Sequence, residues 1–540
     1  MGEPSGNDCD PVLLNSFIVK KQRCRVYFHR GVLIWESEAA PYIKVKLPLK
    51  HVVGVEYEHP SELSAFTNEI ICQEERPEEY TSFTLHYVTQ SKRSKLRLSK
   101  VTLTHADPIQ VASWVKTIRN YIKELTYRPR CLLLFVNPYG GKKRGQKIYE
   151  KNVKPLLARA GIETKVVITQ YRNHAHETIL SQSFDGIDGV ACVGGDGTLA
   201  EVLNALVLRA AKDKGIDTDD PHAELPQPSV PVGVIPGGST DTIAYTLHGT
   251  NDIQTAVLHI ILGESSGLDI CSVHNENSLL RYYASMLSYG YLGDVCKSSE
   301  KFRWMGPKRY DYSGFRKILA NRGYRSEITI LSSDSNSPID GPRCYRDCGT
   351  CKIDESSGEE KPAADWKTIK GRFFMVNGVN ISCACAKAPN GFSPYCHIGD
   401  GCLDVILIKH TSIINILRLL LRVSSKSRTM FDLPFVEVHR AQEFTLQAMP
   451  DPKLELLDPD APDARTSVWN CDGEVVQGTN IKIRVRRQLI RMFSQRMEEE
   501  EHEPSCFVWT IELLPQLPWL RVGLKYSGDK RRPGSRASRS

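Results

Sequence analysis

The sequence Asp188-Gly-Val-Ala-Cys-Val-Gly-Gly-Asp-Gly-Thr-Leu199 indicates the fold of the central part of the chain. Its first half is a continuous apolar strand, and Gly194-Gly195-Asp196-Gly197-Thr198 forms a tight turn before a helix predicted over Leu199–Ala211. Continuous apolar runs are typical of strands that are buried on both faces of a parallel sheet. We therefore predict a strand–turn–helix unit at this position.

The same unit recurs on both sides of this stretch. Strands predicted at Cys131–Val136 and Val232–Ile235 are followed by the glycine-rich turns Asn137-Pro138-Tyr139-Gly140-Gly141-Lys142 and Pro236-Gly237-Gly238-Ser239-Thr240-Asp241. A further strand is predicted at Lys165–Thr169. Strands that alternate with helices in this way predict a doubly wound α/β sheet.

The three glycine turns predict a phosphate-binding edge. Glycine lets the backbone approach a phosphate closely, and the helix that follows offers free N–H groups and the positive end of its dipole. A single turn would be weak evidence, because tight strand-to-helix turns also need glycine for steric reasons alone. Three turns at the carboxyl ends of neighbouring strands mark the edge where open α/β sheets bind ligands. The turns contain neither the P-loop pattern nor the dinucleotide fingerprint with its three spaced glycines.

Residues 10–126 are predicted to form a separate domain of short strands closed by one helix. The helix begins at Pro108 and carries apolar residues at helical spacing around Trp114. This order of elements resembles a pleckstrin-homology (PH) domain, which would bind phosphoinositides. Basic residues crowd two of its hairpins, either as solvated strand and turn residues or as such a lipid site. They are Lys20, Lys21, Arg23, Arg25 and Arg30, and Lys92, Arg93, Lys95 and Arg97.

The remaining chain divides into two lobes and a tail. The α/β nucleotide lobe is predicted over 129–266, and a β-rich lipid-substrate lobe is predicted over 267–492 because helical patterns thin out there. Stretches 332–367 and 451–467 are polar and are predicted to be insertions. Segment 493–540 ends in a basic tail, which we expect to be disordered.

Composition narrows the possible functions. The 540 residues are too many for one hydrophobic core. The net charge of +7, from 70 basic and 63 acidic residues, is too mild for a dedicated nucleic-acid binder but suits contact with anionic membranes. No apolar run approaches the roughly 20 residues that span a bilayer, and the first residues lack a secretory pattern. We expect a cytoplasmic protein that associates peripherally with membranes and keeps most of its 16 cysteines reduced.

The three turns, with Glu201 and Asn204, resemble the catalytic core of the diacylglycerol-kinase and sphingosine-kinase superfamily from Arg130 to about Gln488. Within it the chain is most similar to the ceramide kinase family, which also has an N-terminal PH domain. The features that carry this similarity are Gly238-Ser239-Thr240-Asp241, Cys344…Cys348…Cys351, Ser382-Cys383-Ala384-Cys385 and Trp469-Asn470-Cys471-Asp472-Gly473-Glu474. The resemblance implies ATP-dependent phosphorylation of the primary hydroxyl of ceramide, with Mg²⁺ as cofactor, at the Golgi or plasma membrane. Modulation by Ca²⁺ is a further expectation.

The resemblance also implies a role for each matching residue. Asp196 would be the general base that activates the lipid hydroxyl, with a helix cap as the alternative. Asp472 would be linked to Mg²⁺, and Asp294 would read the polar head of the lipid. The residues expected at the ATP site are Asn137, Gly140, Gly141, Thr169, Gly194, Gly195, Gly197, Thr198, Gly238 and Ser239, with Arg172 nearby and with Arg303 and Arg309 reaching across the cleft. Glu474 would also bind the cofactor, as the partner of Asp472 in an acidic, metal-linked pair.

Three other functions stay open at this point. The substrate of the kinase is sphingosine or diacylglycerol in the nearest alternative. A non-catalytic relative that binds lipid is a second, although the intact Gly140-Gly141-Lys142 and Gly194–Thr198 motifs argue against it. An enzyme similar to NAD kinase is a third, but it gives no reason for a membrane domain.

Two further features have several interpretations. The triplet Cys344, Cys348 and Cys351 supplies three thiols of the four ligands that a tetrahedral metal site needs, and Cys383 or Cys385 would complete it. Redox sensing, or no role, is the alternative. The helix predicted over Ile413–Arg422 is a calmodulin target, a membrane-facing helix or an ordinary packed helix with a basic face.

Overall fold

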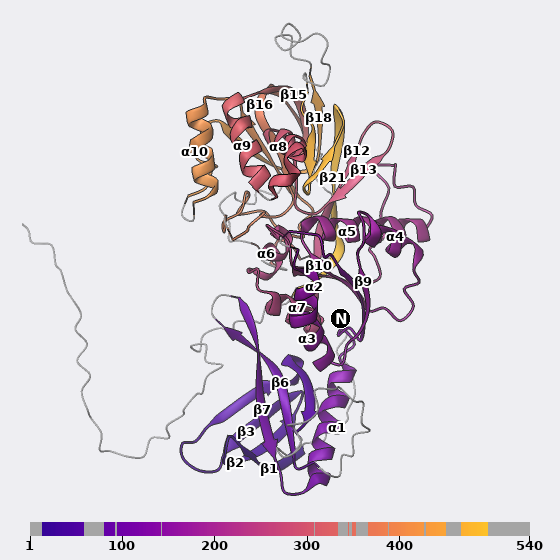
Figure 1. Ribbon diagram of the computed structural model, residues 1–540, viewed down its shortest axis with the longest axis vertical. Helices are drawn as coiled ribbons and strands as arrows, with labels where there is room; N and C mark the ends of the chain where they lie inside the picture. Colours follow the sequence, from indigo (N-terminus) through magenta and orange to yellow (C-terminus); the bar gives the residue numbers. More distant parts are fainter. Residues whose placement is uncertain are drawn as a thin grey trace, which may run out of the picture.

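The computed structural model describes residues 13–58, 80–91, 94–141, 143–306, 308–332, 344, 348–352, 365–386, 388–425, 428–449 and 466–494. Lys142, Lys92, Arg93, the side chain of Arg303, most of both polar insertions and the basic tail lie outside the described residues. The PH-like domain lies at one end of the molecule, the α/β lobe lies in the middle and the β-rich lobe lies at the other end (Figure 1). No helix in these ranges is both long and apolar enough to cross a bilayer.

The PH-like domain is a seven-stranded antiparallel sheet in the order β4-β3-β2-β1-β7-β6-β5, packed against one helix. Helix α1 begins where Asp107 accepts a hydrogen bond from the Ile109 amide, with Pro108 in its first turn. Trp114 is 1% exposed and packs edge-on against Phe17, as a core residue. The predicted arrangement is confirmed. The elements are β1 Leu13–Val19, β2 Gln22–His29, β3 Val32–Ser37, β4 Lys44–Pro48, a 3₁₀ turn Leu49–His51, β5 Val52–Tyr57, β6 Ser82–Ser91, β7 Lys95–Thr104 and α1 Pro108–Glu124.

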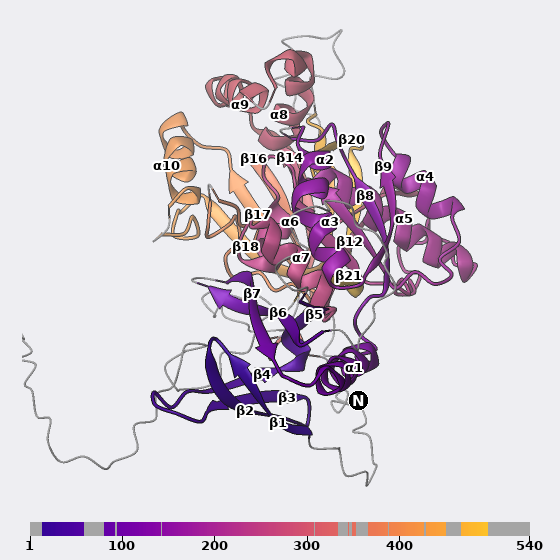
Figure 2. The ribbon, with the colours of Figure 1, turned by 60° about the horizontal axis from the view of Figure 1, so that its bottom comes forward.

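The α/β lobe contains four parallel strands in the order β11-β10-β8-β9. Strands β8, β10 and β11 are buried along their whole length, because helices cover both faces of the sheet (Figure 2). The predicted doubly wound sheet is therefore confirmed. The elements are β8 Cys131–Val136, α2 Gly145–Ile148, a π-helical turn Tyr149–Val153, α3 Lys154–Arg159, β9 Glu163–Ile168, α4 His174–Ser181, β10 Gly189–Gly194, α5 Asp196–Asp213, β11 Val232–Pro236, α6 Thr242–His248 and α7 Ile253–Leu262.

The β-rich lobe continues the same sheet. Strand β21 runs antiparallel to β12 along most of its length and reaches β11 of the α/β lobe through the pair Val232 and Met492. Three helices lie on the outside of this lobe, of which α8 and α9 were not predicted (Figure 1). The elements are β12 Ser265–His274, β13 Leu279–Tyr283, β14 Met286–Gly290, α8 Tyr291–Ser299, a 3₁₀ turn Glu300–Met305, α9 Lys308–Ala320, β15 Tyr324–Ser332, β16 Trp366–Val379, β17 Leu403–Lys409, α10 Ile413–Val423, β18 Val436–Ala448, β19 Trp469–Cys471, β20 Glu474–Val476 and β21 Asn480–Phe493.

Strands β5, β6 and β7 dock the PH-like domain onto the α/β lobe, with β7 against helix α7. Val53, Val88 and Leu96 belong to the same buried apolar cluster as α7. The guanidinium of Arg97 makes two hydrogen bonds of 2.7 and 3.0 Å to Asp252, the carboxylate that caps α7. The Arg97 guanidinium therefore links the two domains in this structure. It is directed to Asp252 and not to a phosphoinositide site on the PH-like domain.

The docking leaves no room for a side chain at residue 54. A methyl group on Gly54 would lie 2.3 Å from the carbonyl oxygen of Arg159 in the α/β lobe. The Gly54→Ala variant should therefore lose about 1–3 kcal/mol of stability, because the backbones of the two domains must separate. Thermal unfolding of the full chain measures this, with Leu14→Ala as a control, since Leu14 is 61% exposed on β1. Equal unfolding temperatures for the two variants would contradict this contact.

Candidate functional site

The three glycine turns meet at one edge of the α/β sheet. They follow β8, β10 and β11, with β10 in the middle. The Gly237 amide donates to the Gly194 carbonyl at 3.0 Å, and the Asn137 amide donates to the Val193 carbonyl at 3.0 Å. The turns therefore lie side by side at the carboxyl ends of their strands, as the sequence predicted.

The turns touch through their backbones. A methyl group on Gly238 would lie 2.5 Å from the Cα of Gly195, and one on Gly141 would lie 2.7 Å from the carbonyl carbon of Gly238. Gly141 also has φ +52°, a conformation that side-chain-bearing residues rarely adopt. Gly197 differs, because nothing lies within 4 Å of the position of its missing methyl group. Steric need thus explains Gly141, Gly195 and Gly238, and Gly197 alone faces open space.

Asn137 holds the first turn in shape. Its side-chain oxygen accepts from the amides of Tyr139 and Gly140 at 2.9 and 3.0 Å, and its side-chain nitrogen donates to the Thr198 hydroxyl at 2.8 Å. Asn137 and Thr198 are therefore brought together, as predicted, but their polar groups are directed at each other and at the turn. This geometry indicates that they shape the site.

Asp196 is the cap of helix α6. One carboxylate oxygen accepts from the Thr242 amide at 3.0 Å and the other accepts from the Ile243 amide at 3.1 Å. Burial raises the pKa of Asp196, and the nearby charge of Asp472 adds to the rise, while the two amides oppose it. The Thr242 side chain is a third hydrogen-bond donor to this carboxylate, and a carboxylate has about four lone-pair sites, so one site remains for a proton. Asp196 therefore caps a helix, which was the alternative role for this residue. The cap does not prevent Asp196 from acting as a base.

Asp472 comes from the β-rich lobe, in the turn between β19 and β20, and is buried. Its carboxylate accepts from the amides of Ala284, Ser285 and Met286 at 2.8, 3.0 and 3.1 Å, and also from the Ser285 hydroxyl. Three of these donors are on Oδ1 and one is on Oδ2, so Oδ2 keeps a lone pair. The side chain fixes the start of β14, and its link to Mg²⁺ stays a prediction.

Glu474 and Arg172 form an ion pair across the two lobes. Glu201 on α5 accepts a hydrogen bond from the Asn173 amide at 3.2 Å. Burial raises the pKa of Glu201, and the charge of Glu474 adds to the rise. Thr169 is buried at the end of β9, where its amide donates to the Val136 carbonyl at 2.9 Å. The structure therefore places Glu474 and Arg172 together on the rim of the first lobe.

Asp294, on α8, lies in a polar network that sequence reasoning did not find. It accepts from the Tyr324 hydroxyl and from the Ser467 hydroxyl, the latter at 2.7 Å, and its carboxylate lies 3.7 Å from the Lys317 ammonium. Ser467 closes one of the polar insertions and Tyr324 opens β15, so nothing in the local sequence links them to Asp294. The network fixes the orientation of the Asp294 carboxylate.

Arg309 contacts neighbours on its own side of the cleft. Its guanidinium lies 3.4 Å from the Glu300 carboxylate and donates to the Tyr310 hydroxyl at 2.7 Å. The thiol of Cys296 donates to the Gly473 carbonyl at 3.3 Å. Burial raises the pKa of this thiol, the charge of Glu474 adds to the rise, and the charge of Arg309 opposes it. Arg309 therefore lies at the Glu474 end of the cleft, and among the described residues its ion pair and hydrogen bond are both to neighbours on its own side.

The fit of Mg²⁺ to these side chains is partial. Asp196, Glu201, Asp472 and Glu474 approach the turns from the two lobes, but in the described ranges they do not gather into a carboxylate cluster. Mg²⁺ usually keeps several waters and binds through one or two carboxylates together with substrate phosphates. The residues therefore fit an ion that arrives with a nucleotide.

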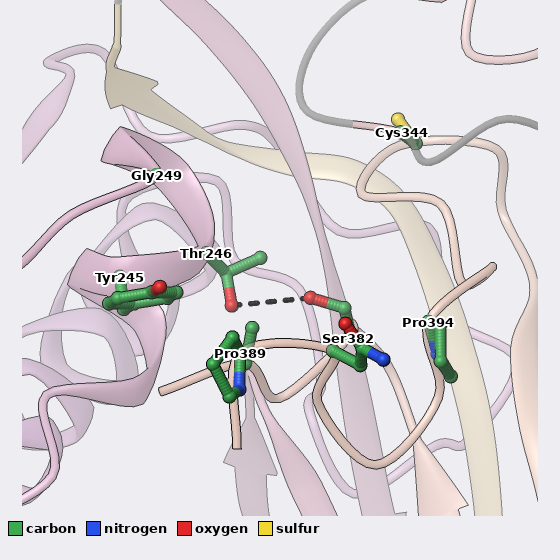
Figure 3. A pocket seen from close by; sticks show the side chains of 9 residues that line it. Tyr245, Thr246, Gly249, Cys344, Ser382, Pro389 and Pro394 are labelled. Carbon is green, nitrogen blue, oxygen red and sulfur yellow. Dashed lines mark hydrogen bonds between the residues drawn. The ribbon is translucent and has the colours of Figure 1, made fainter. Parts of the chain in front are cut away.

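A cavity of about 140 Å³ lies between helix α6 and the 382–394 segment (Figure 3). The hydroxyls of Thr246 and Ser382 lie 3.5 Å apart across it, and Tyr245, Pro389 and Cys344 form other parts of its wall. Pockets that hold drug-sized ligands are larger, about 300–1,000 Å³. This cavity is too small for a two-chain lipid.

Three family models match the chain. The model for the ceramide kinase PH domain matches residues 13–118, the model for the diacylglycerol kinase catalytic domain matches residues 131–273, and the model for the ceramide kinase C-terminal domain matches residues 283–507.

Curated relatives match over most of their length. Ceramide kinase from Mus musculus is 37% identical over 520 residues, which are 89% of this chain and 97% of that protein. Ceramide kinase from Homo sapiens is 35% identical over 525 residues, which are 90% of this chain and 97% of that protein. A ceramide kinase-like protein from Homo sapiens is 29% identical over 443 residues, 76% of this chain and 77% of that protein.

Two alanine substitutions separate the structural glycines from the open one. Gly238→Ala should lower the unfolding temperature, because its methyl group meets the backbone of Gly195. Gly197→Ala should unfold at the wild-type temperature, because its methyl group meets nothing. Thermal unfolding without nucleotide measures both. A Gly197→Ala variant as unstable as Gly238→Ala would show that the space beside Gly197 is not open.

Proposed function

The chain belongs to the ceramide kinase family, and on this premise we propose that it transfers the γ-phosphate of ATP to the primary hydroxyl of ceramide. The observation that carries the proposal is the meeting of three backbone-packed glycine turns with the carboxylate of Asp196 at one sheet edge. Full-length similarity to ceramide kinases supports the choice of lipid. Sphingosine and diacylglycerol are the nearest alternatives.

The glycine turns would bind the phosphates of ATP. Gly141, Gly197 and Ser239 are exposed along the edge, and helix α5 begins at Asp196 with its first amides directed to the same edge. Free amides and a helix dipole attract phosphate oxygens. Asn137 and Thr198 would keep the first two turns in register. When bound with ATP, Mg²⁺ would neutralise the charge that develops on the transferred phosphoryl group.

Asp196 would act as the general base. Its carboxylate takes the proton from the lipid hydroxyl while the hydroxyl oxygen forms a bond to the γ-phosphorus. The bond between the γ-phosphorus and the bridging oxygen breaks, and ADP leaves with the electron pair. The pKa of Asp196 is raised by burial and by Asp472, which brings it closer to the pH at which a base works best. The α6 amides hold the carboxylate in place.

Asp294 would orient the polar head of the lipid. Its carboxylate is fixed by Tyr324, Ser467 and Lys317 and is largely buried, so it can accept from a hydroxyl or an amide of ceramide without reorganising. Arg309 and Glu474 lie at the same end of the cleft. These roles, and that of Arg303, stay predictions that rest on family resemblance.

The membrane would contact the outer face of the β-rich lobe. We define this apolar face by Trp304, Phe315, Leu319, Ile414 and Leu421, which are 82, 61, 58, 66 and 73% exposed. Exposed apolar side chains clustered on neighbouring helices mark interaction sites.

Two observations favour a membrane over calmodulin as the occupant of this face. The proposed substrate is a membrane lipid, and helices α9 and α10, which carry four of these five residues, also carry the exposed cations Lys308, Arg316 and Arg418, which suit anionic headgroups. Ile416 and Leu419 of α10 are packed into the lobe, so a partner that surrounds the whole helix would have to pull them out. In both views α10 lies on the side to which the PH sheet projects, opposite α1 (Figures 1 and 2).

The PH domain would add a second contact with the membrane. Lys20 and Lys21 form the tip of the β1–β2 hairpin with positive φ values, whereas Arg30 occupies the turn at the other end of β2. A phosphoinositide site would therefore lie at the tip of the β1–β2 hairpin. It would not include Arg30, or Arg97, which is hydrogen-bonded to Asp252. Golgi or plasma membrane residence, calcium modulation and calmodulin binding stay predictions.

Transfer of labelled γ-phosphate tests the reaction. Wild type should label ceramide in mixed micelles in preference to sphingosine and diacylglycerol, and Asp196→Asn should lower the rate by about 10²–10⁴-fold because the base is lost. The wild-type rate should fall at acid pH with an apparent pKa above that of an ordinary aspartate. ATP affinity and unfolding temperature serve as controls. Preferential labelling of another lipid would identify that lipid as the substrate in place of ceramide. If no lipid is labelled while ATP still binds, the protein is better described as a lipid-binding protein without kinase activity.

Sedimentation with vesicles tests the apolar face. The double variant Ile414→Glu and Leu421→Glu should bind several-fold less to vesicles of phosphatidylserine and phosphatidylcholine, because charge replaces exposed apolar surface. Ile109→Glu is the matched control, since Ile109 is 69% exposed on α1, away from α10. Wild-type binding by the double variant would rule out this face, and equal loss in the control would show that the effect is not specific to it.

A further inference from the structure

Three cysteines and one histidine converge beside the cleft. Cys344, Cys348 and Cys351 meet His397, and their four ligand atoms all lie within 4.8 Å of one another. The fourth member was predicted to be Cys383 or Cys385. The thiol of Cys383 instead donates to the Ser285 carbonyl at 3.6 Å. His397 is 46 residues from Cys351 along the chain, so only the fold brings the two together.

The distances fit a tetrahedral zinc ion. Zn–S bonds of about 2.3 Å at tetrahedral angles place two sulfurs about 3.8 Å apart, and a sulfur and an imidazole nitrogen about 3.6 Å apart. The sulfur of Cys351 lies 3.6 Å from that of Cys344 and 3.7 Å from that of Cys348. The Nδ1 of His397 lies 3.8 and 3.0 Å from the sulfurs of Cys351 and Cys348. All three cysteines are free, and disulfide sulfurs would be about 2.05 Å apart.

The surroundings favour a structural ion over a catalytic one. Cys344, Cys351 and His397 are 5, 2 and 9% exposed, and four protein ligands leave no open position for substrate. The amides of Cys351 and Lys352 both donate to the Cys348 carbonyl, which folds Cys348–Lys352 into a tight turn with two ligands on one side. Soft thiolates with imidazole select zinc among the common divalent ions.

The cluster joins three separate parts of the chain. Gln488 of β21 donates from its side-chain nitrogen to the carbonyls of Cys351 and Gly399, at 2.7 Å each. Cys344 forms part of the cavity wall opposite Thr246 of helix α6, the helix that Asp196 caps (Figure 3). An ion at the cluster would therefore tie a polar insertion and the segment around His397 to the strand that links the two lobes.

We propose that Cys344, Cys348, Cys351 and His397 bind one structural zinc ion, which fixes the 382–394 segment that forms a wall of the cavity beside helix α6. This site is independent of the phosphoryl transfer proposed above. Zinc binding releases the thiol protons, and the ion takes no part in transfer of phosphate.

Metal content of the full-length protein tests the proposal directly. Purified wild type should contain one zinc per chain by mass spectrometry of the elements, and replacement with Co²⁺ should give the absorption bands of tetrahedral thiolate-bound cobalt. His397→Cys should keep both signals, since four cysteines also form a zinc site. Cys348→Ser and His397→Ala should lose most of the zinc. Cys385→Ser is the matched control, because this cysteine belongs to the same part of the chain but not to the cluster.

Each outcome has a defined meaning. A wild type without zinc that also gives no tetrahedral cobalt spectrum would overturn the proposal, even if the variants fail to fold. Zinc loss in Cys385→Ser equal to that in Cys348→Ser would overturn the ligand assignment. Chelation of the zinc should lower the unfolding temperature of wild type and His397→Cys but not that of His397→Ala. None of these measurements depends on kinase activity, so they stay valid if the proposed reaction is wrong.

Discussion

Backbone contact among the three glycine turns is the constraint on which the catalytic half of the molecule depends. Parallel strands about 4.8 Å apart bring the turns so close that Gly195 and Gly238 have no space for side chains between them. The same closeness lines the edge of the sheet with backbone amides. The fold of the first lobe therefore fixes the edge at which we propose that phosphate binds, and the first amides of α6 hold Asp196 at this edge.

The second lobe contributes through strand pairing. Strands β12 and β21 pair along most of their length and carry the sheet from one lobe into the other. Asp472 reaches the site from the second lobe and organises the start of β14, while Asn204 of α5 exchanges hydrogen bonds of 2.9 Å with the backbone of Tyr282. The pKa of Asp196 thus depends on a charge from the second lobe. The sheet that continues through both lobes holds the two carboxylates in place relative to each other.

Sequence reasoning found what local patterns encode and missed what only the tertiary structure brings together. Strands β8, β10 and β11 were predicted because burial on both faces makes them uniformly apolar, and the glycine-rich turns after them led to the candidate site. Helix α9 was missed because Gly314 and exposed aromatic residues obscure its helical periodicity. The contacts of Asp472, the network around Asp294 and the position of His397 come from residues far apart along the chain, for which the sequence carries no local signal.

The PH domain is not a transferable module. Its strands share an apolar core with α7, and Arg97 completes the cap of that helix through Asp252. A chimera that takes this domain from a relative would need α7 to travel with it, since neither surface is built to face water. Substitutions on β7 and on α7 are therefore expected to covary during evolution. A cut after α1 divides the sequence into two parts. In the structure these two parts share a buried apolar cluster.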